Sequence, residues 1–357
     1  MKSLKICIKG AYGEANFGDD LLMLVLENYF LKEFDDVHLN FIGEQSLYPK
    51  SLLKKSEYRE QLKRYDWLVY GGGTQFFAFK ESESYSLLKK ISMVLKKPQL
   101  LLDKLYNEKI EKRVDKISFL GFGLGPFHNN QGMIRKAKSR LIDASFIGVR
   151  DEISFNYCND WGLTSFLGAD IVFSKYFKLP QLKTKMAKSK KRIGIIVRDW
   201  NWNERGTIYT DKLKQIYSQY SDSEDIELDF IIFSSVKDKN TFKSLKSENP
   251  VVWDPSESTV DQFISKLNDY DAFITARYHG AILGVLLRKP VICVEIEPKL
   301  KILTKQLSEL QLWAQPFEIE SLIDHINNLN YNVEYKDIDV FVDRANNMLA
   351  EFTKALK

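Results

Sequence analysis

Three ionisable side chains follow two short apolar runs late in the sequence. Arg277 and His279 come directly after the run 272–275, and Lys299 follows a second run at 290–294. In a parallel α/β sheet the carboxyl ends of the strands face the ligand, so these side chains are expected at one edge. Two cations and a histidine suit an anionic substrate on which a proton is moved. The alternative is that both cations are solvated and that His279 is an ordinary core histidine.

The elements that would position these residues are short apolar or β-branched runs alternating with helical patterns. Such alternation is typical of parallel βαβ units. The expected strands are 5–9, 37–42, 67–70, 117–121, 146–149 and 165–167 in the first half, and 192–197, 228–233, 251–253, 272–275 and 291–294 in the second. A final helical pattern covers 338–356.

A second set of alternating strands and helices begins after residue 190, which indicates two domains. We predict an α/β fold of two doubly wound, Rossmann-like domains facing a central cleft, with residues 1–178 in the first and 190–335 in the second. Residues 336–357 would form a helix that packs back on the first domain. The segment 175–192 carries seven lysines and no apolar periodicity, as linkers and solvated loops do.

Length and composition limit the classes to which the protein can belong. A chain of 357 residues with 44% hydrophobic and 28% charged residues is typical of a globular protein of about two domains. The net charge of +4 is too small to predict nucleic acid as the main partner. It leaves room for a phosphorylated ligand or an anionic membrane surface.

Cysteine usage and hydropathy predict a cytoplasmic protein. The three cysteines, Cys7, Cys158 and Cys293, lack metal-ligand spacing, and we interpret them as reduced packing residues. Neither a signal-peptide pattern nor a run of roughly 18 apolar residues is visible, so we expect at most attachment to the inner face of a membrane. The leucine-rich segment 84–113, with its lysine pairs, fits an interfacial helix pair or amphipathic helices covering a sheet.

Glycine-rich loops follow several of the expected strands. They occupy residues 10–18, 71–73 and 121–125, and neither of the last two is a nucleotide-binding fingerprint. Each suits close approach of a ligand to the backbone, or simply a tight turn from strand to helix. Asp19 is expected to cap the helix after the first loop, and Arg150 adds a cation after the strand 146–149.

Seven motifs then occur in a recognisable order. They are Asn16-Phe17-Gly18-Asp19-Asp20, Gly71-Gly72-Gly73, Gly121-Phe122-Gly123-Leu124-Gly125-Pro126, Val149-Arg150-Asp151 with Ser154, Gly168-Ala169-Asp170, Arg277-Tyr278-His279, and Lys299. Together they resemble the polysaccharide pyruvyl transferase family over roughly residues 5–305.

The resemblance implies a fold like that of GT-B glycosyltransferases, phosphoenolpyruvate as donor, and a pyruvyl ketal formed on a pair of sugar hydroxyls. It also implies that Arg150, His279 and Lys299 are catalytic. The sequence departs from the family pattern after Asp170, where Ile171 stands in place of the usual proline.

Residue chemistry agrees with that donor. Arg150 from one domain and Arg277 with Lys299 from the other could hold its carboxylate and phosphate. His279 is the natural proton shuttle. We expect no metal and no cofactor beyond phosphoenolpyruvate as donor substrate. The predicted substrate-binding residues are Arg277, Asn16, Asp19, Gly72, Gly73, Gly123, Asp170, Arg198 and Trp200.

The acceptor is expected to be a sugar of a surface polysaccharide or a lipid-linked oligosaccharide. The loop 198–205 holds two tryptophans, which either stack on sugar rings or pack in the core. Two other functions remain open. One is a GT-B glycosyltransferase that uses a nucleotide sugar, and the other is a non-catalytic glycan-binding partner.

Overall fold

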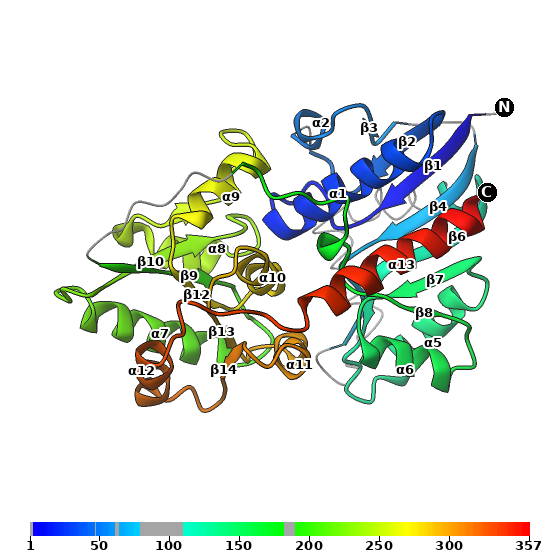
Figure 1. Ribbon diagram of the computed structural model, residues 1–357. Coiled ribbons are helices and arrows are strands. Elements are labelled where there is room, and N and C mark those ends of the chain that lie inside the picture. The colour runs from blue at the N-terminus through cyan, green and yellow to red at the C-terminus, as the bar shows by residue number, and fades with distance from the viewer. Residues whose placement is uncertain (1–2, 47, 61–63, 79–109, 182–189) are drawn as a thin grey trace, which may run out of the picture. The chain divides into compact units, whose positions relative to one another are not determined.

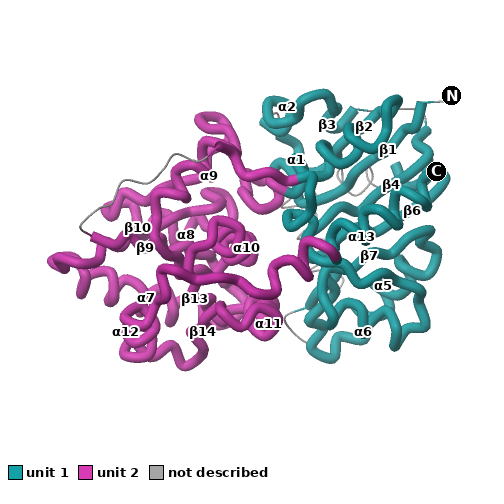
Figure 2. The backbone as a smooth tube through the Cα atoms, in the orientation of Figure 1, with its two compact units in different colours: residues 1–13, 22–176, 344–357 teal, residues 14–21, 177–343 magenta. Residues whose placement is uncertain are grey.

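A computed structural model describes residues 3–46, 48–60, 64–78, 110–181 and 190–357. The chain divides into two compact units (Figure 2). The first unit comprises residues 1–13, 22–176 and 344–357, and the second comprises residues 14–21 and 177–343. Of the segment 84–113, for which an interfacial helix pair was one interpretation, residues 84–109 lie outside the described part of the chain. In the part of the chain that is described, no helix is both long and apolar enough to cross a membrane.

The first unit is built on a parallel sheet (Figure 1). Its order is β3-β2-β1-β4-β6-β7-β8, and β5 pairs with the end of β6. The strands are β1 (Leu4–Lys9), β2 (Val37–Ile42), β3 (Glu57–Tyr58), β4 (Tyr65–Gly71), β5 (Thr74–Phe76), β6 (Val114–Leu124), β7 (Phe146–Val149) and β8 (Phe166–Leu167). The continuous apolar runs within β4, β6 and β7 are explained by helices on both faces of the sheet.

Among the described residues, four helices besides the last one of the chain pack within this unit. They are α2 (Pro49–Leu52), α5 (Gln131–Leu141), α6 (Glu152–Asp160) and the greater part of α1 (Phe17–Glu33). A short 3-10 turn, η1 (Ile171–Phe173), follows β8. Ile147 of β7 lies in a cluster with Leu141 of α5 and Cys158 of α6, which places these helices on one face.

The last helix, α13 (Ile338–Leu356), covers the other face through residues 344–356. The side chain of Met348 lies where Gly148 and Gly168 have no side chain. Phe352 is fully buried against Trp67 and Phe146 of the sheet. The carboxyl terminus is therefore part of the core of the first unit.

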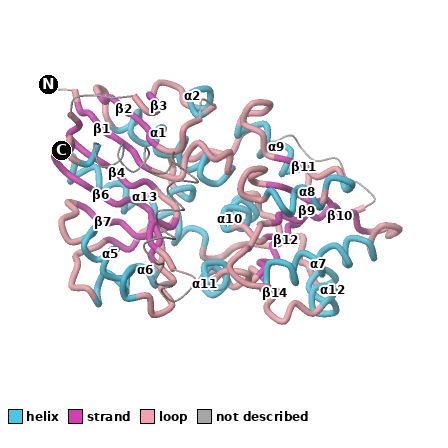
Figure 3. Tube along the Cα trace, turned by 180° about the vertical axis from the view of Figure 1, so that it is seen from behind, coloured by secondary structure: helices cyan, strands magenta, loops and turns pink. Residues whose placement is uncertain are grey.

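The second unit has its own parallel sheet, of order β11-β10-β9-β12-β13-β14. The strands are β9 (Lys191–Val197), β10 (Ile226–Ile232), β11 (Val251–Val252), β12 (Ala272–Thr275), β13 (Val291–Val294) and β14 (Gln311–Trp313). The helices are α7 (Arg205–Gln219), α8 (Lys239–Ser244), α9 (Val260–Asn268), α10 (Tyr278–Leu286), α11 (Pro298–Gln306) and α12 (Ile319–Asn327), with the 3-10 turn η2 (Lys246–Glu248). Figure 3 shows strands and helices alternating along each unit. Helix α10 packs on β12 and β13, and α12 packs on β14 and α7.

The α/β class and the parallel sheets are as predicted from the sequence. Three strands were missed: β3, β5 and β14, each of two or three residues. Runs so short carry no periodicity. The predicted domain limits also need correction at residues 14–21, which belong to the second unit although they were expected in the first.

All three cysteines are buried and unbridged. Burial raises the pKa of Cys7 to about 12 and that of Cys158 to about 11, which disfavours the reactive thiolate.

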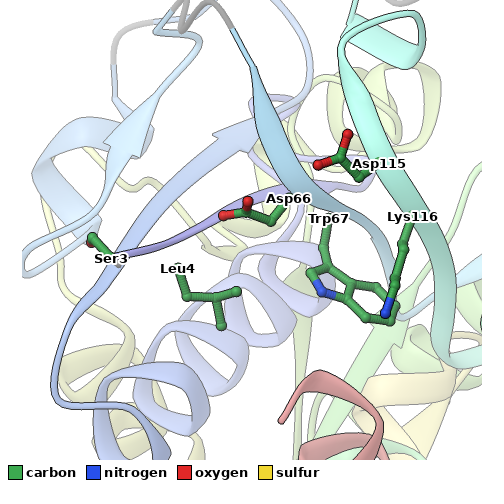
Figure 4. A pocket seen from close by; sticks show the side chains of 6 residues that line it. All are labelled: Ser3, Leu4, Asp66, Trp67, Asp115 and Lys116. Carbon is green, nitrogen blue, oxygen red and sulfur yellow. The ribbon is translucent and has the colours of Figure 1, made fainter. Parts of the chain in front are cut away.

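A hollow of about 300 Å³ lies at the amino ends of β1, β4 and β6 (Figure 4). Its wall includes Trp67, with the ammonium group of Lys116 at 4.8 Å from the ring centroid. Residues that follow the carboxyl ends of the same strands lie at the opposite edge of this sheet.

Candidate active site

Strand β12 of the second unit ends in a tight turn that starts α10. The hydroxyl of Thr275 accepts a hydrogen bond from the backbone N–H of Arg277 at 3.0 Å and donates one to the Arg277 carbonyl at 2.9 Å. Arg277 precedes α10 without capping it through its side chain. A helix start of this kind offers N–H groups and the positive end of the helix dipole to an anion.

Arg277 is buried and its guanidinium has two partners. One nitrogen bonds Asp238, which is fully buried after β10, and another donates to the Asn16 amide oxygen at 3.4 Å. Asp238 also accepts from the backbone N–H of Asp199 at 3.0 Å. Because a buried charge needs compensation, the carboxylate of Asp238 holds the guanidinium in place.

Asn16 belongs to the segment 14–21, which is anchored in the second unit by aromatic packing. The ring of Phe17 lies 4.9–5.2 Å from the rings of Phe233, Trp253 and Phe263. The indole N–H of Trp253 donates to the buried carboxylate of Asp20 at 2.9 Å. These contacts explain why the segment leaves the unit that precedes it in the chain.

Asp19 lies inside the first turn of α1 rather than before it, so it does not cap the helix as predicted. Its carboxylate accepts a hydrogen bond from Asn16 and lies 3.3 Å from the ammonium of Lys237, which also pairs with Glu14. Burial alone would raise the pKa of Asp19, but Lys237, Asn16 and His279 together lower it. The carboxylate is therefore ionised at neutral pH.

His279 is the second residue of α10 and is half buried. Its imidazole lies against Gly18 of α1: a Cβ added to Gly18 would come closer than 3.0 Å to both Nδ1 and Cγ of the ring. Since Asp19 follows Gly18, a negative charge lies next to the segment on which the ring rests. The predicted acid–base residue therefore lies in the first turn of α10 and interacts electrostatically with an ionised carboxylate of α1.

A buried carboxylate also binds the cations after β9 and β13. Glu297 is 4% exposed and pairs with Arg198 and with Lys299, the latter at 2.7 Å. Burial would raise the pKa of Glu297, but Arg198 and Lys299 lower it. The side chains of Arg198 and Lys299 remain 22% and 26% exposed, so both can still reach a ligand.

The two tryptophans after β9 differ in exposure. Trp200, the predicted ligand-binding residue, is 6% exposed; Arg198 covers its ring and its indole donates to Asn203 at 3.2 Å. Trp202 is 43% exposed. Trp200 therefore packs in the protein, whereas Trp202 is largely accessible to solvent.

In the first unit the predicted residues gather around Arg150, which is 4% exposed. Its guanidinium donates to the Thr74 hydroxyl at 3.0 Å and lies 3.5 Å from the carboxylate of Asp170. The carboxylate of Asp151 lies 3.7 Å from the guanidinium and also caps α6. Asp170 caps the turn η1 as well, so it holds its place with isoleucine as the next residue.

The predicted glycines serve close packing within the first unit. A Cβ on Gly123 would lie 3.1 Å from two nitrogens of Arg150, so the guanidinium lies over this glycine. Gly72 and Gly73 both have φ of 71°, a conformation that favours glycine, and the Gly73 carbonyl accepts from the N–H of Gly123 at 2.8 Å. The glycines are thus close to Arg150, and their contacts are with the protein itself.

The structure therefore divides the predicted residues between the units. The second unit holds Asn16, Asp19, Arg198, Trp200, Arg277, His279 and Lys299, and the first holds Gly72, Gly73, Gly123, Arg150 and Asp170. Sequence reasoning did not name Gly18, Lys237, Asp238 or Glu297 as site residues, although Gly18 is part of one of the seven motifs. Lys237 and Asp238 follow the expected strand 228–233. Their position after a strand end could have identified them as candidate site residues. Among the described residues, no group of three or more His, Cys, Asp or Glu side chains is placed to hold a metal.

The family model for polysaccharide pyruvyl transferases matches residues 16–298. The chain belongs to the polysaccharide pyruvyl transferase family. The matched range begins at Asn16 and includes Arg150, Arg277 and His279, and it ends one residue before Lys299. No curated protein sequence matches the chain.

Solved structures similar to this pyruvyl transferase family member are GT-B proteins. The UDP-GlcNAc 2-epimerase of Methanocaldococcus jannaschii, solved with UDP-GlcNAc and UDP, has a TM-score of 0.59 at 14% identity and covers 99% of this chain and 100% of its own. The MnaA–UDP structure from S. aureus has a TM-score of 0.58 at 11% identity, covering 98% and 94%. The Neisseria meningitidis epimerase has a TM-score of 0.57 at 10% identity, covering 99% of each chain. At such identities the likeness shows the GT-B fold alone.

Proposed function

We propose that the protein transfers a pyruvyl group from phosphoenolpyruvate to two hydroxyls of one sugar, which belongs to a surface polysaccharide or its lipid-linked precursor. The observation that carries the proposal is the group of ionisable side chains at one edge of the second sheet. There His279, at the start of α10, adjoins cations that buried carboxylates hold in place. A cytoplasmic location, with peripheral attachment to the inner membrane face, belongs to the same proposal.

The cations suit the donor because phosphoenolpyruvate carries a carboxylate and a phosphate. Arg198 and Lys299 share Glu297, and both side chains are partly exposed to solvent. The starts of α10 and α11 lack a side-chain cap, so their first N–H groups add to the attraction for an anion. Because carboxylates already hold these cations in one conformation, less side-chain entropy is lost when the ligand binds.

The reaction needs one proton moved at carbon. A sugar hydroxyl adds to C2 of phosphoenolpyruvate while the methylene carbon takes up a proton and becomes a methyl group. A second hydroxyl then displaces phosphate from C2, and the proton of that hydroxyl leaves with the phosphate. We assign the proton transfer to His279, since an imidazole both accepts and donates near neutral pH. Arg150 is proposed as a further active-site cation.

The proposal is tested by following phosphate release from phosphoenolpyruvate in the presence of glycan acceptors. We expect release that depends on the acceptor, and a pyruvate-sized mass increment on the glycan. Release of nucleotide from a nucleotide sugar, with no use of phosphoenolpyruvate, would instead identify a glycosyltransferase of the same fold. Binding of glycan with neither donor consumed would favour the non-catalytic alternative.

Replacing Lys299 with alanine should weaken donor use about tenfold to a hundredfold, because a charge-assisted hydrogen bond contributes about 1.5–3 kcal/mol. The measurement is kcat/KM for phosphoenolpyruvate. Lys301→Ala is the matched control on the same helix, where Lys301 pairs with Glu295 and its side chain is 47% exposed. Equal kinetics in the two variants would remove Lys299 from the donor site.

Replacing Trp202 with alanine should raise the KM for the acceptor about fivefold to tenfold and leave the KM for phosphoenolpyruvate unchanged, because a stacked aromatic ring contributes about 1 kcal/mol. Phe166→Ala, which removes a 38% exposed ring from the first unit, is the control. Trp200→Ala should instead lower the free energy of unfolding by about 3–5 kcal/mol. An acceptor KM that does not change in Trp202→Ala would exclude a stacking role for this residue.

A further inference from the structure

Gly18 occupies a position where a helix favours almost any other residue. It is the second residue of α1, and its φ lies outside the left-handed region, so its backbone conformation does not require glycine. Glycine is among the poorest helix formers because it loses the most conformational freedom on folding. Neither helix propensity nor backbone conformation therefore explains a glycine here.

Gly18 lies against the ring of His279. An added Cβ at Gly18 would lie closer than 3.0 Å to Nδ1 and Cγ and 3.1 Å from Cβ of His279. Real Cβ atoms essentially never approach other atoms closer than 3.0 Å. A side chain at position 18 would therefore displace the imidazole from its present place.

Neither partner can easily move away. On one side, Phe17 packs among aromatic rings, and its backbone N–H donates to the Phe233 carbonyl at 2.9 Å. On the other side, the turn at Thr275 fixes the start of α10, and Gly280 lies against the Thr275 hydroxyl. Both backbones are held on several sides, so the collision falls on the His279 side chain.

Asp19 provides a second link between the two segments. His279 contributes electrostatically to the lowered pKa of Asp19, after Lys237 and the hydrogen bond from Asn16. The histidine is therefore near enough to the first turn of α1 to interact with it electrostatically. Displacing the ring would change this interaction as well as the position of its nitrogens.

We propose that Gly18 is a positioning residue, which sets the place of the His279 imidazole by offering bare backbone to one side of the ring. The inference rests on the proposed function in so far as it assigns proton transfer to His279. It assigns Gly18 no contact with substrate. A displacement of about 1 Å in a reacting group can lower turnover about a hundredfold.

The test is Gly18→Ala, with Gly132→Ala as the matched control. Gly132 is likewise the second residue of a helix, α5, and the nearest atom to its added Cβ is Asn130 Oδ1 at 3.4 Å. We expect Gly18→Ala to lower kcat about a hundredfold, to keep the KM for phosphoenolpyruvate within about twofold, and to shift the pH profile of kcat. Gly132→Ala should leave all three unchanged.

Thermal unfolding separates this inference from the proposed function. In the wild-type background Gly18→Ala should lower Tm by more than about 2 °C, although alanine favours a helix. In the His279→Ala background the same change should raise Tm, because the ring is absent. That cycle needs no substrate, so it stands even if phosphoenolpyruvate is not the donor.

Two results would overturn the inference. If Gly18→Ala raises Tm in the wild-type background, as Gly132→Ala should, then the ring is not confined by Gly18. If Tm follows the expected cycle while kcat and its pH profile are unchanged, then Gly18 only packs against His279 and has no part in placing it for the reaction.

Discussion

Replacing His279 with asparagine should preserve binding of phosphoenolpyruvate and lower turnover by about 10²–10⁴-fold, as expected when an acid–base group is lost. The asparagine amide keeps one hydrogen bond of the ring but cannot titrate near neutral pH. Donor binding is measured by calorimetry and turnover by single-turnover phosphate release. In deuterated solvent, deuterium in the methyl group of the ketal would report the proton transfer itself.

The control for this change is His325→Asn. His325 is another partly buried histidine of the second unit, in the last turn of α12. Its replacement should leave turnover unchanged. If His279 were only a packing residue, His279→Asn would lower Tm and leave turnover per folded molecule nearly unchanged. Full activity in a folded variant would leave His279 without a catalytic role.

Replacing Phe352 with alanine should lower the free energy of unfolding of the first unit by about 3–5 kcal/mol, the usual cost of removing a large buried side chain. Phe352 is fully buried and contacts aromatic rings of both the sheet and α1: Tyr29, Phe30, Trp67 and Phe146. The cavity cannot close easily, because these rings come from separate elements. Urea unfolding followed by circular dichroism measures the change.

Lys354→Ala, two residues further along α13, is the control. The side chain of Lys354 is 72% exposed and pairs with Glu351, and such surface pairs contribute about 0–1 kcal/mol. A loss below 1 kcal/mol for Phe352→Ala would show that α13 is not an integral part of the core of the first unit.

Most of the regular structure could be predicted from the sequence. The strands β2, β7, β12 and β13 have the predicted bounds. For β7, β12 and β13 the reason is that a strand buried on both faces is an almost continuous apolar run. The helix α13 also matches its predicted range, 338–356, since its apolar residues recur with the helical period. The strands β3 and β14 were beyond such reasoning, because they are held by pairing with a neighbour and not by a pattern of their own.

The partners of the site residues could not be predicted. Asp238 is one of many acidic residues in the sequence. Its role comes from its pairing with Arg277, which is 39 residues away in the chain. The exposure of Trp202 and the burial of Trp200 are equally invisible in the sequence, because both lie in one loop without periodicity. Local sequence patterns predict which residues follow a strand. Which side chains those residues then contact depends on how the strands are ordered in the sheet.

The sequence by itself determined that strand ends would deliver Arg277, His279 and Lys299 to one edge of a parallel sheet, because alternating strands and helices leave no other direction for those loops. Only the tertiary structure decided that residues 14–21 would join that edge. Phe17 finds its aromatic neighbours more than 200 residues away in the chain, at Phe233, Trp253 and Phe263, and no local pattern encodes such a contact. The contact of Gly18 with His279 follows from that packing.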